Sequence, residues 1–170
     1  MQTLSFMTAN FVARPIGYHM PEGWGQGDAA TREWFRPLDT FEERFSDMLA
    51  EIAELGFNAV DLWVAHLHWS WATPEHLDTA ARLLARHKLT PVSYAGSFGA
   101  TPAELRACCA VCERLGIPLL SGNAKLFHQD RDTFVSIVRD HGLIFCLENH
   151  PEKTPQDLAA QLGAGDEEIV

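Results

Sequence analysis

The chain repeats one pattern four times: an amphipathic stretch of helical period, a turn, and a short run of almost entirely apolar residues. The turns centre on Gly56, Lys88, Gly116 and Gly142, which are spaced by 32, 28 and 26 residues. A repeat of this length is typical of one β/α unit. Short apolar runs such as residues 143–147 suit parallel strands that are covered on both faces. The pattern therefore predicts a parallel α/β fold.

The number of repeats predicts the architecture. We expect five strands and five helices, after which Ile169 and Val170 look like the opening of a sixth strand. A closed barrel of eight such units takes about 250 residues, whereas this chain has 170. An open five-stranded sheet would leave unpaired edges, which natural proteins avoid. We therefore predict one domain, residues 1–170, that forms the first five β/α units of a TIM-type barrel. The alternative is an open sheet whose edges are covered by another chain, as in a homo-oligomer.

Local signals predict the element boundaries. The first strand is expected from Thr3 to about Val12, and residues 14–37 form a long segment rich in glycine and aromatic side chains. Disordered segments are poor in aromatic residues, so this segment is predicted to be an ordered loop that folds over a pocket. Thr40 with Glu43 predicts a capping box at the next helix. Later helix starts are predicted at four residues with capping side chains, Thr73, Thr101, Asp130 and Thr154.

Charge and composition restrict the partners and the compartment. Acidic residues outnumber basic ones by 23 to 13, and the formal net charge is −10. The lysines and arginines are scattered singly, so neither nucleic acid nor an anionic membrane is an expected partner. The sequence shows neither a secretory signal nor a transmembrane stretch, and we expect a soluble, cytoplasmic protein. Cys108, Cys109 and Cys112 lie on one apolar helix face and are interpreted as core residues rather than as a metal site.

Polar and aromatic residues follow the predicted strands. Because the carboxyl ends of parallel strands meet at one edge of the sheet, these residues are expected to form one site. Flat aromatic faces combined with hydrogen-bonding groups suit a small polyhydroxylated ligand. The candidate site residues, in chain order, are Trp24, His66, His68, Trp69, Lys125, Glu148, Asn149 and His150.

Glu148 is the strongest candidate for chemistry, because it ends an otherwise apolar strand. A carboxylate held there, partly removed from water, can be a ligand of a hard metal ion, a general base, or both. The alternative is a solvated glutamate on the rim. His150 points to the same face only if the strand continues, and Pro151 disfavours that continuation.

The remaining candidates have two interpretations each. His66 and His68 are two residues apart, so a strand would place both imidazoles on one face, where they could bind a transition metal or line a pocket. Trp69, together with Trp63 and Trp71, could form a wall on which a sugar stacks, or these tryptophans could be packing residues; Trp24 is expected near them, after the first strand. Lys125 could bind a phosphate or carboxylate group, or it could be a solvated side chain. We interpret these residues as substrate-binding groups.

Three segments carry a family resemblance. They are MTANFVAR at residues 7–14, LGFNAVDLW at residues 55–63 and LENHPEKTP at residues 147–155. They resemble the sugar phosphate isomerase/epimerase family, whose members are xylose-isomerase-like TIM barrels related to the family 2 apurinic endonucleases. The likeness runs in order along the whole chain and is most specific at the end of the fifth predicted strand.

The resemblance implies an activity and a cofactor. It implies proton transfer next to the carbonyl group of a small sugar or sugar phosphate, assisted by one divalent metal ion (Mn, Mg or Zn) at the barrel mouth. In this family a glutamate that ends strand five binds the metal, and Glu148 matches it as metal ligand and catalytic residue. The other ligands, an aspartate, a histidine and a second glutamate, come from later strands. They would lie beyond Val170, so this chain is expected to be inactive alone.

Three other functions are compatible with the same scaffold. Dehydration of a cyclic polyol needs the same cation and the same proton abstraction. A non-catalytic sugar-binding protein needs only the aromatic and polar groups of the rim. A DNA-repair endonuclease is disfavoured by the acidic net charge and by the scarcity of lysine and arginine at the predicted strand ends.

Overall fold

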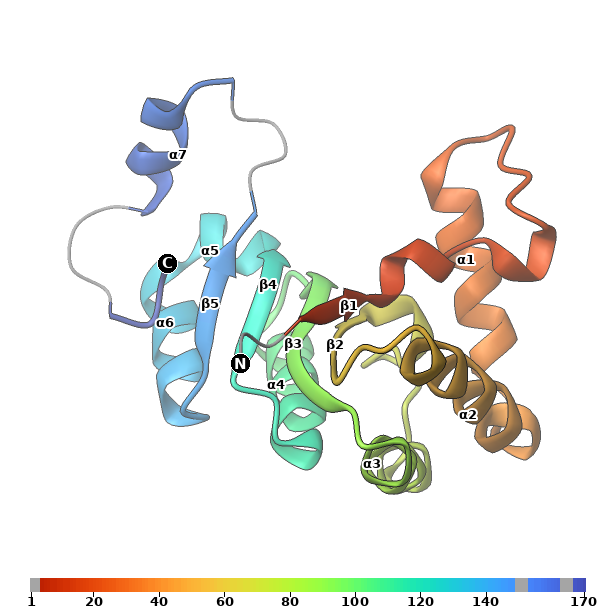
Figure 1. The fold of residues 1–170 in the computed structure, drawn as a ribbon. Helices are drawn as coiled ribbons and strands as arrows, with labels where there is room; N and C mark the ends of the chain where they lie inside the picture. Colours follow the sequence, from red (N-terminus) through yellow and green to blue (C-terminus); the bar gives the residue numbers. More distant parts are fainter. Residues whose placement is uncertain (1–3, 149–152, 163–166) are drawn as a thin grey trace.

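A computed structural model describes residues 4–148, 153–162 and 167–170. The described strands form one parallel sheet in which every strand pairs with its neighbours in sequence (Figure 1). A doubly wound sheet would reverse its strand order at a switch point, and this order does not reverse. The predicted arrangement, the first five units of a β/α barrel, is therefore confirmed. The strands are β1 (Ser5–Met7), β2 (Ala59–Trp63), β3 (Thr90–Ser97), β4 (Leu119–Asn123) and β5 (Ile144–Leu147).

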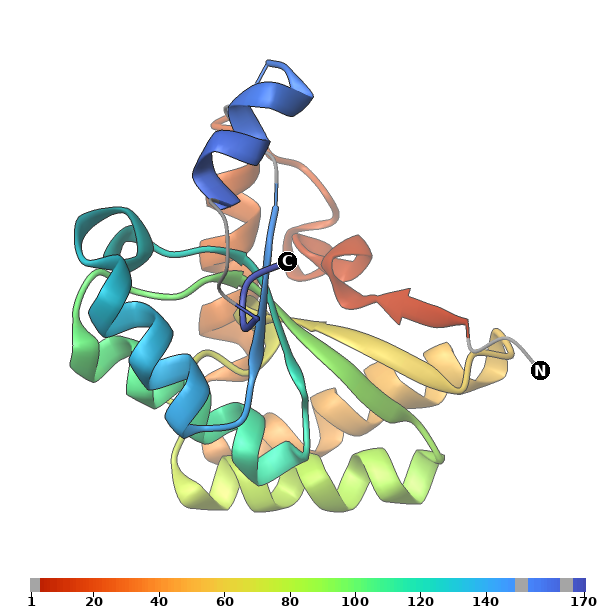
Figure 2. The same cartoon turned by 90° about the vertical axis from the view of Figure 1, so that its left-hand side faces the viewer.

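The helices between the strands cover one face of the sheet (Figures 1 and 2). Right-handed crossovers between sequential strands place the helix that directly precedes each following strand on the same side. None of the helices in the described part of the chain combines the length and apolar character needed to cross a membrane. The helices are α1 (Trp24–Phe35), α2 (Leu38–Glu54), α3 (Pro74–His87), α4 (Pro102–Leu115), α5 (Lys125–Gln129), α6 (Arg131–Asp140) and α7 (Pro155–Leu162), with 3-10 turns η1 (Thr8–Phe11), η2 (Arg14–Ile16) and η3 (Val64–His66).

The register of the strands decides which side chains point away from the helices. Ala95 pairs with Trp63 on one side and with Ser121 on the other, and Ser121 pairs with Cys146. Side chains alternate between the two faces along a strand, so these residues share the inner face and Glu148, two residues after Cys146, follows them. The adjacent residues of each strand instead point toward the helices.

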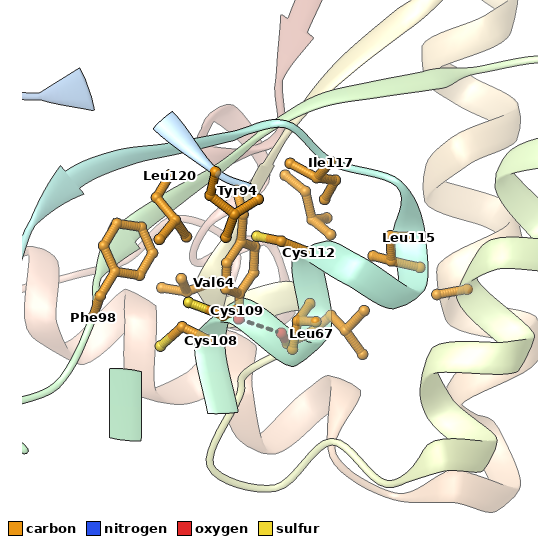
Figure 3. Close-up of a cluster of buried hydrophobic side chains, with 14 of the residues drawn as sticks. Val64, Leu67, Tyr94, Phe98, Cys108, Cys109, Cys112, Leu115, Ile117 and Leu120 are labelled. Carbon is orange, nitrogen blue, oxygen red and sulfur yellow. Dashed lines mark hydrogen bonds between the residues drawn. The ribbon is translucent and has the colours of Figure 1, made fainter. Parts of the chain in front are cut away.

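The helix-facing side chains build the core, as the packing between β3, β4 and α4 illustrates (Figure 3). Tyr94 is completely buried, and its hydroxyl donates a hydrogen bond to the Leu67 carbonyl oxygen at 2.7 Å. Cys108, Cys109 and Cys112 are also buried, and burial raises the pKa of each thiol. Neutral thiols are poor metal ligands. The interpretation of these cysteines as core residues is therefore confirmed.

The first strand, β1, is shorter than predicted. After Met7, a side-chain hydroxyl instead of a backbone carbonyl accepts the hydrogen bond from the neighbouring strand. The Thr8 hydroxyl accepts the backbone N–H of Trp63 at 2.8 Å. The chain then turns into η1 instead of continuing as a strand to Val12.

The segment of residues 14–37 is ordered but is not a loop throughout, because it contains η2 and α1. Its glycines disfavour a helix when the sequence is taken alone. Tertiary packing explains one of them: a Cβ on Gly27 would lie 2.7 Å from the Ala13 Cβ. The Thr31 hydroxyl also accepts the Ala13 backbone N–H at 2.9 Å. These contacts stabilise α1 against the start of the segment.

The predicted helix caps are correct except at α2. Thr73 and Thr101 begin capping boxes at α3 and α4, and the Asp130 carboxylate accepts the Thr133 N–H at α6. Thr154 likewise accepts the N–H of Asp157 at α7. The prediction of a capping box at Thr40 is wrong. The N-cap of α2 is Pro37, which has an extended backbone, and the helix begins at Leu38, so Thr40 already lies inside it.

The end of the chain adds to the sheet next to β5. Ile169 forms a parallel bridge with Phe145, and Val170 exchanges backbone hydrogen bonds with the same strand. The prediction that these residues open a further strand is confirmed. The five-unit sheet is thereby extended on its β5 side.

Two glycines allow β3 and β4 to approach closely beneath the strand ends. Gly96 pairs with Gly122, and a Cβ on Gly122 would lie 1.9 Å from the Gly96 carbonyl oxygen. Gly122 also has φ +149°, a conformation that L side chains rarely adopt. Only glycine fits at this position, and the next residue, Asn123, carries the first polar side chain of the rim.

Gly122→Ala is therefore expected to lower the free energy of unfolding by about 3 kcal/mol or more, because overpacking adds to backbone strain. Gly116→Ala is the matched control: φ is +68° there, but a Cβ added at this position would meet open space, so only about 1 kcal/mol is expected. Urea unfolding of both variants measures the difference. Equal losses would contradict the close approach of the two strands.

Candidate functional site

A cleft lies at the carboxyl ends of the strands and has two adjoining lobes. The first lobe has a volume of about 340 Å³ and the second about 430 Å³. Both are lined by Arg32, His68, Ser97 and Asn123. The first lobe is also lined by Trp24, Gly25, Asp28, Trp63, Val64, Gly96 and Glu148. The second lobe is also lined by Trp69, Ser70, Phe98, Gly99, Ala100, Glu104 and Lys125.

Glu148 enters the first lobe from the end of β5. Its backbone N–H continues the sheet by donating to the Gly122 carbonyl at 2.9 Å. Its side chain is partly buried, and its Oε1 accepts a hydrogen bond from the Ser121 hydroxyl at 3.0 Å. Ser121 lies on the inner face of β4, so this bond directs the carboxylate inward. The arrangement differs from that of a glutamate extended into bulk water.

His68 is held as a neutral ring at the junction of the two lobes. Its Nε2 lies 3.2 Å from Nη1 of Arg32, and its Nδ1 lies 2.8 Å from the Ser70 hydroxyl. The pKa of His68 is lowered to about 4 by burial and by the positive charge of Arg32. The Ser70 backbone N–H also donates to Nδ1 at 3.1 Å, so both ring nitrogens have polar contacts. His68 therefore orients Arg32 without adding charge.

Arg32 and Asp28 connect α1 to the strand ends. The two side chains lie one helical turn apart and form an ion pair at 3.3 Å. The Asp28 Oδ1 also accepts the indole N–H of Trp63 at 2.7 Å. These contacts place one cation at the centre of the cleft, with its carboxylate partner oriented by the end of β2.

The tryptophans of the cleft have fixed orientations. Trp24 and Trp63 pack edge to face, with ring centroids 6.0 Å apart, and Trp24 remains half exposed. Trp69 stacks on His68 at 4.8 Å and donates its indole N–H to the Ser97 carbonyl at 3.3 Å. Aromatic surface is therefore available in both lobes.

The second lobe ends at Lys125, the exposed first residue of α5. Glu104 lies opposite, and its carboxylate accepts the backbone N–H groups of Ala100 and Thr101. These bonds and the nearby charge of Lys125 lower the pKa of Glu104. Arg32 and Lys125 are the cations of the second lobe. Arg32 is paired with Asp28 and Glu104 balances Lys125, so the lobe is formally neutral but offers two positively charged hydrogen-bond donors.

The structure brings together five of the eight predicted residues. Trp24, His68 and Glu148 line the first lobe, and His68, Trp69 and Lys125 line the second. Asn149 and His150 lie outside the described residues.

His66 does not share a face with His68. The expectation that both imidazoles point the same way requires a strand, but the chain forms the 3-10 turn η3 after Trp63. His66 is 1% exposed, lies 3.3 Å from the Thr8 hydroxyl, and faces a separate cavity beside α2. The two residues therefore do not form a paired imidazole site.

The sequence analysis missed Asp28 and Arg32. Both lie in the segment that was predicted to be a loop, and their four-residue spacing has meaning only on a helix. The sequence does contain one indication of a helix here: an acid and a base, Asp28 and Arg32, stand four residues apart with two alanines between them. The glycines on the N-terminal side concealed that signal.

Comparisons with known proteins establish the fold. No protein-family model matches the sequence, and no curated protein matches it. A xylose isomerase-like TIM barrel protein from Mycobacterium smegmatis, solved in complex with magnesium, matches with a TM-score of 0.54 and 16% identity over 95% of this chain and 62% of that chain. An uncharacterized protein from Parabacteroides distasonis matches with a TM-score of 0.51 and 15% identity over 67% of this chain and 51% of that chain. The chain thus spans roughly half to three fifths of these structures and shares the TIM-barrel fold.

The magnesium of the Mycobacterium smegmatis structure raises the question of a metal site here. Among the described residues, no group of three or more His, Cys, Asp or Glu side chains could hold a metal ion. Asp28 and Glu148 both face the first lobe, but Asp28 is already bonded to Arg32 and Trp63. One remaining carboxylate does not satisfy a hard divalent cation, which takes about six oxygen ligands. The described cleft residues alone do not fit the metal that the resemblance implies.

Burial of His66 predicts a pH-dependent stability. Its folded-state pKa is lowered to about 3, mainly by burial, whereas the unfolded chain titrates near 6.5. The unfolded chain therefore binds the extra proton between these values, and stability falls as the pH decreases below about 6.5. From pH 7 to pH 5 we expect this residue to lower the free energy of unfolding by about 2 kcal/mol. Urea unfolding of wild type and His66→Gln at both pH values measures this loss. The difference in free energy of unfolding between pH 7 and pH 5 should be smaller in the variant. An identical difference would contradict a buried neutral imidazole.

Proposed function

We propose that the cleft binds a small sugar or sugar phosphate, and that Glu148 transfers a proton next to the carbonyl group of this ligand, as in an isomerase or epimerase. The observation that supports this proposal most is the position of the Glu148 carboxylate. It faces the same lobe as two tryptophans and a neutral histidine, and the adjoining lobe is lined by the two cationic side chains Arg32 and Lys125.

The first lobe suits the carbon skeleton of a polyol. Trp24 and Trp63 offer apolar surface for C–H groups, and their edge-to-face packing keeps that surface in place. Ser97 and Asn123, on the neighbouring ends of β3 and β4, offer donors and acceptors for hydroxyl groups. Sites for polar small molecules combine apolar walls with a few placed polar groups in this way.

The second lobe suits an anionic end of the ligand. Arg32 is oriented by Asp28 and His68, and Lys125 stands across the lobe with a flexible stem. A guanidinium and an ammonium group can bind a phosphate between them. A phosphate placed there would direct the rest of a sugar phosphate toward the first lobe and Glu148.

Glu148 provides the proton-transfer group. A carboxylate can remove a proton from the carbon next to a carbonyl group, which gives an enediolate, and return it to the same face of the neighbouring carbon, while the hydroxyl proton of that carbon moves to the former carbonyl oxygen. Return to the opposite face, as in an epimerase, needs a second acid on that face. Positioned acid–base groups contribute about 10²–10⁴-fold in rate. The hydrogen bond from Ser121 to Oε1 restricts the rotation of this carboxylate. Binding of a divalent metal by Glu148, which the family resemblance implies, stays a prediction. Without that metal and the second glutamate, we expect this chain alone to show proton exchange at Glu148 but no complete isomerisation or epimerisation, in line with the expectation that it is inactive alone.

We predict that Glu148→Gln abolishes proton exchange and spares binding. With D-ribulose 5-phosphate as the probe, tryptophan fluorescence measures binding, and ¹H NMR in D₂O measures exchange at the carbon atoms beside the carbonyl group. The variant should bind within a fewfold of wild type, because the amide keeps the size of the side chain, and exchange should fall by about 10²-fold or more.

Glu54→Gln is the matched control, because Glu54 is an exposed glutamate at the end of α2. It should bind and exchange like wild type. Equal exchange by wild type and Glu148→Gln would contradict the proposed role of Glu148. Binding without exchange by wild type would instead favour the non-catalytic sugar-binding alternative.

A further inference from the structure

A second cavity lies beside the cleft and shares no lining residue with it. It has a volume of about 430 Å³ and is lined by residues of η1, η2, α1, α2 and η3. The turn η3 separates the two sites, because His66 faces this cavity and His68 faces the cleft. We name it the α1–α2 cavity. A cavity of this size can hold a small molecule.

The floor of the α1–α2 cavity is apolar and rigid. Phe11, Phe35 and Met48 are each at least 90% buried and line it. The Phe35 ring also packs against the His66 ring, with centroids 5.1 Å apart. Such a floor favours an apolar or aromatic body over a polyol, which distinguishes this cavity from the cleft.

Two arginines at the rim are held in place by aromatic rings. The Arg14 guanidinium lies 3.8 Å from the centroid of Phe11, and the Arg44 guanidinium lies 3.7 Å from that of Trp34. Arg44 also donates a hydrogen bond to the Trp34 carbonyl oxygen. Cation–π contacts of this kind orient a guanidinium without neutralising its charge. The rim is therefore built before any ligand arrives.

The charges at the rim leave room for one negative charge. Arg14 is paired with Glu51 through two hydrogen bonds of 2.8 and 2.9 Å, which compensates its charge. Arg44 forms no ion pair among the residues that the structure describes, although Asp47 lines the cavity three residues further along α2. With Glu51 and Asp47 counted, the formal charge of the rim is zero, so the cavity offers one guanidinium outside the described ion pairs rather than a net positive charge. One such guanidinium suits a carboxylate better than a doubly charged phosphate.

We propose that the α1–α2 cavity is a second ligand site, which binds a small carboxylate with an aromatic body: the ring on the apolar floor, and the carboxylate at Arg44. This site is independent of the proposed function of the cleft. Its ligand differs in class from that of the cleft, because the cavity offers few hydroxyl-binding groups and the cleft offers many.

The test uses benzoate as the probe, with benzamide as its uncharged counterpart, and follows the Trp34 indole signal in ¹⁵N NMR spectra after assignment with Trp34→Phe. We expect saturable benzoate binding that shifts the Trp34 signal, and at least tenfold weaker binding of benzamide. Arg44→Met, which keeps the apolar stem and removes the charge, should weaken benzoate binding at least tenfold. Arg86→Met is the matched control, because Arg86 is an exposed arginine on α3, and it should bind like wild type.

A floor variant checks the aromatic part separately. Met48→Phe adds volume to the floor and should also weaken benzoate binding, with dispersed NMR spectra showing that the variant folds. The proposal is overturned by any of three results: no saturable benzoate binding, equal effects of Arg44→Met and Arg86→Met, or shifts confined to the indole signals of the cleft.

Discussion

Parallel pairing of the strands in chain order is the constraint on which the rest of the structure depends. It places the covering helices on one face and the carboxyl ends of all strands at one edge. The inner face can then carry polar side chains such as Ser121, because the apolar core forms on the helix side. Gly96 and Gly122 let two of these strand ends meet without side chains between them. Residues at the ends of four strands, on the inserted helix α1 and at the starts of α4 and α5 thereby reach a common cleft.

The helix α1 adds charged side chains to the edge of the sheet where the carboxyl ends of the strands lie. A simple strand-to-helix connection would leave the strand ends open, whereas α1 brings Asp28 and Arg32 over β2 and η3. Those two residues add an ion pair to the rim and place the Arg32 guanidinium where the two lobes meet. The same helix, packed beside α2, also forms a wall of the α1–α2 cavity. One insertion therefore supports both of the sites proposed for this protein.

The sequence was sufficient for features that depend on periodicity and failed where tertiary contacts override local preference. The spacing of the repeats predicted the order of strands and helices, and the apolar run before Glu148 placed that residue at a strand end. The Thr8 hydroxyl, which accepts the Trp63 N–H, ended β1 early. The turn after Trp63 separated His66 from His68. Neither event leaves a trace in a pattern of polar and apolar residues, because each depends on a contact between segments more than fifty residues apart.

The curved sheet directs the Glu148 carboxylate inward, into the cleft that holds Trp63 and His68. A crystal structure of this chain tests this placement most directly. We expect a Glu148 carboxylate oxygen within hydrogen-bonding distance of the Ser121 hydroxyl, near 3.0 Å, on the face of the sheet opposite α4 and α6. A Glu148 side chain that extends into bulk solvent, with Ser121 bonded elsewhere, would contradict it.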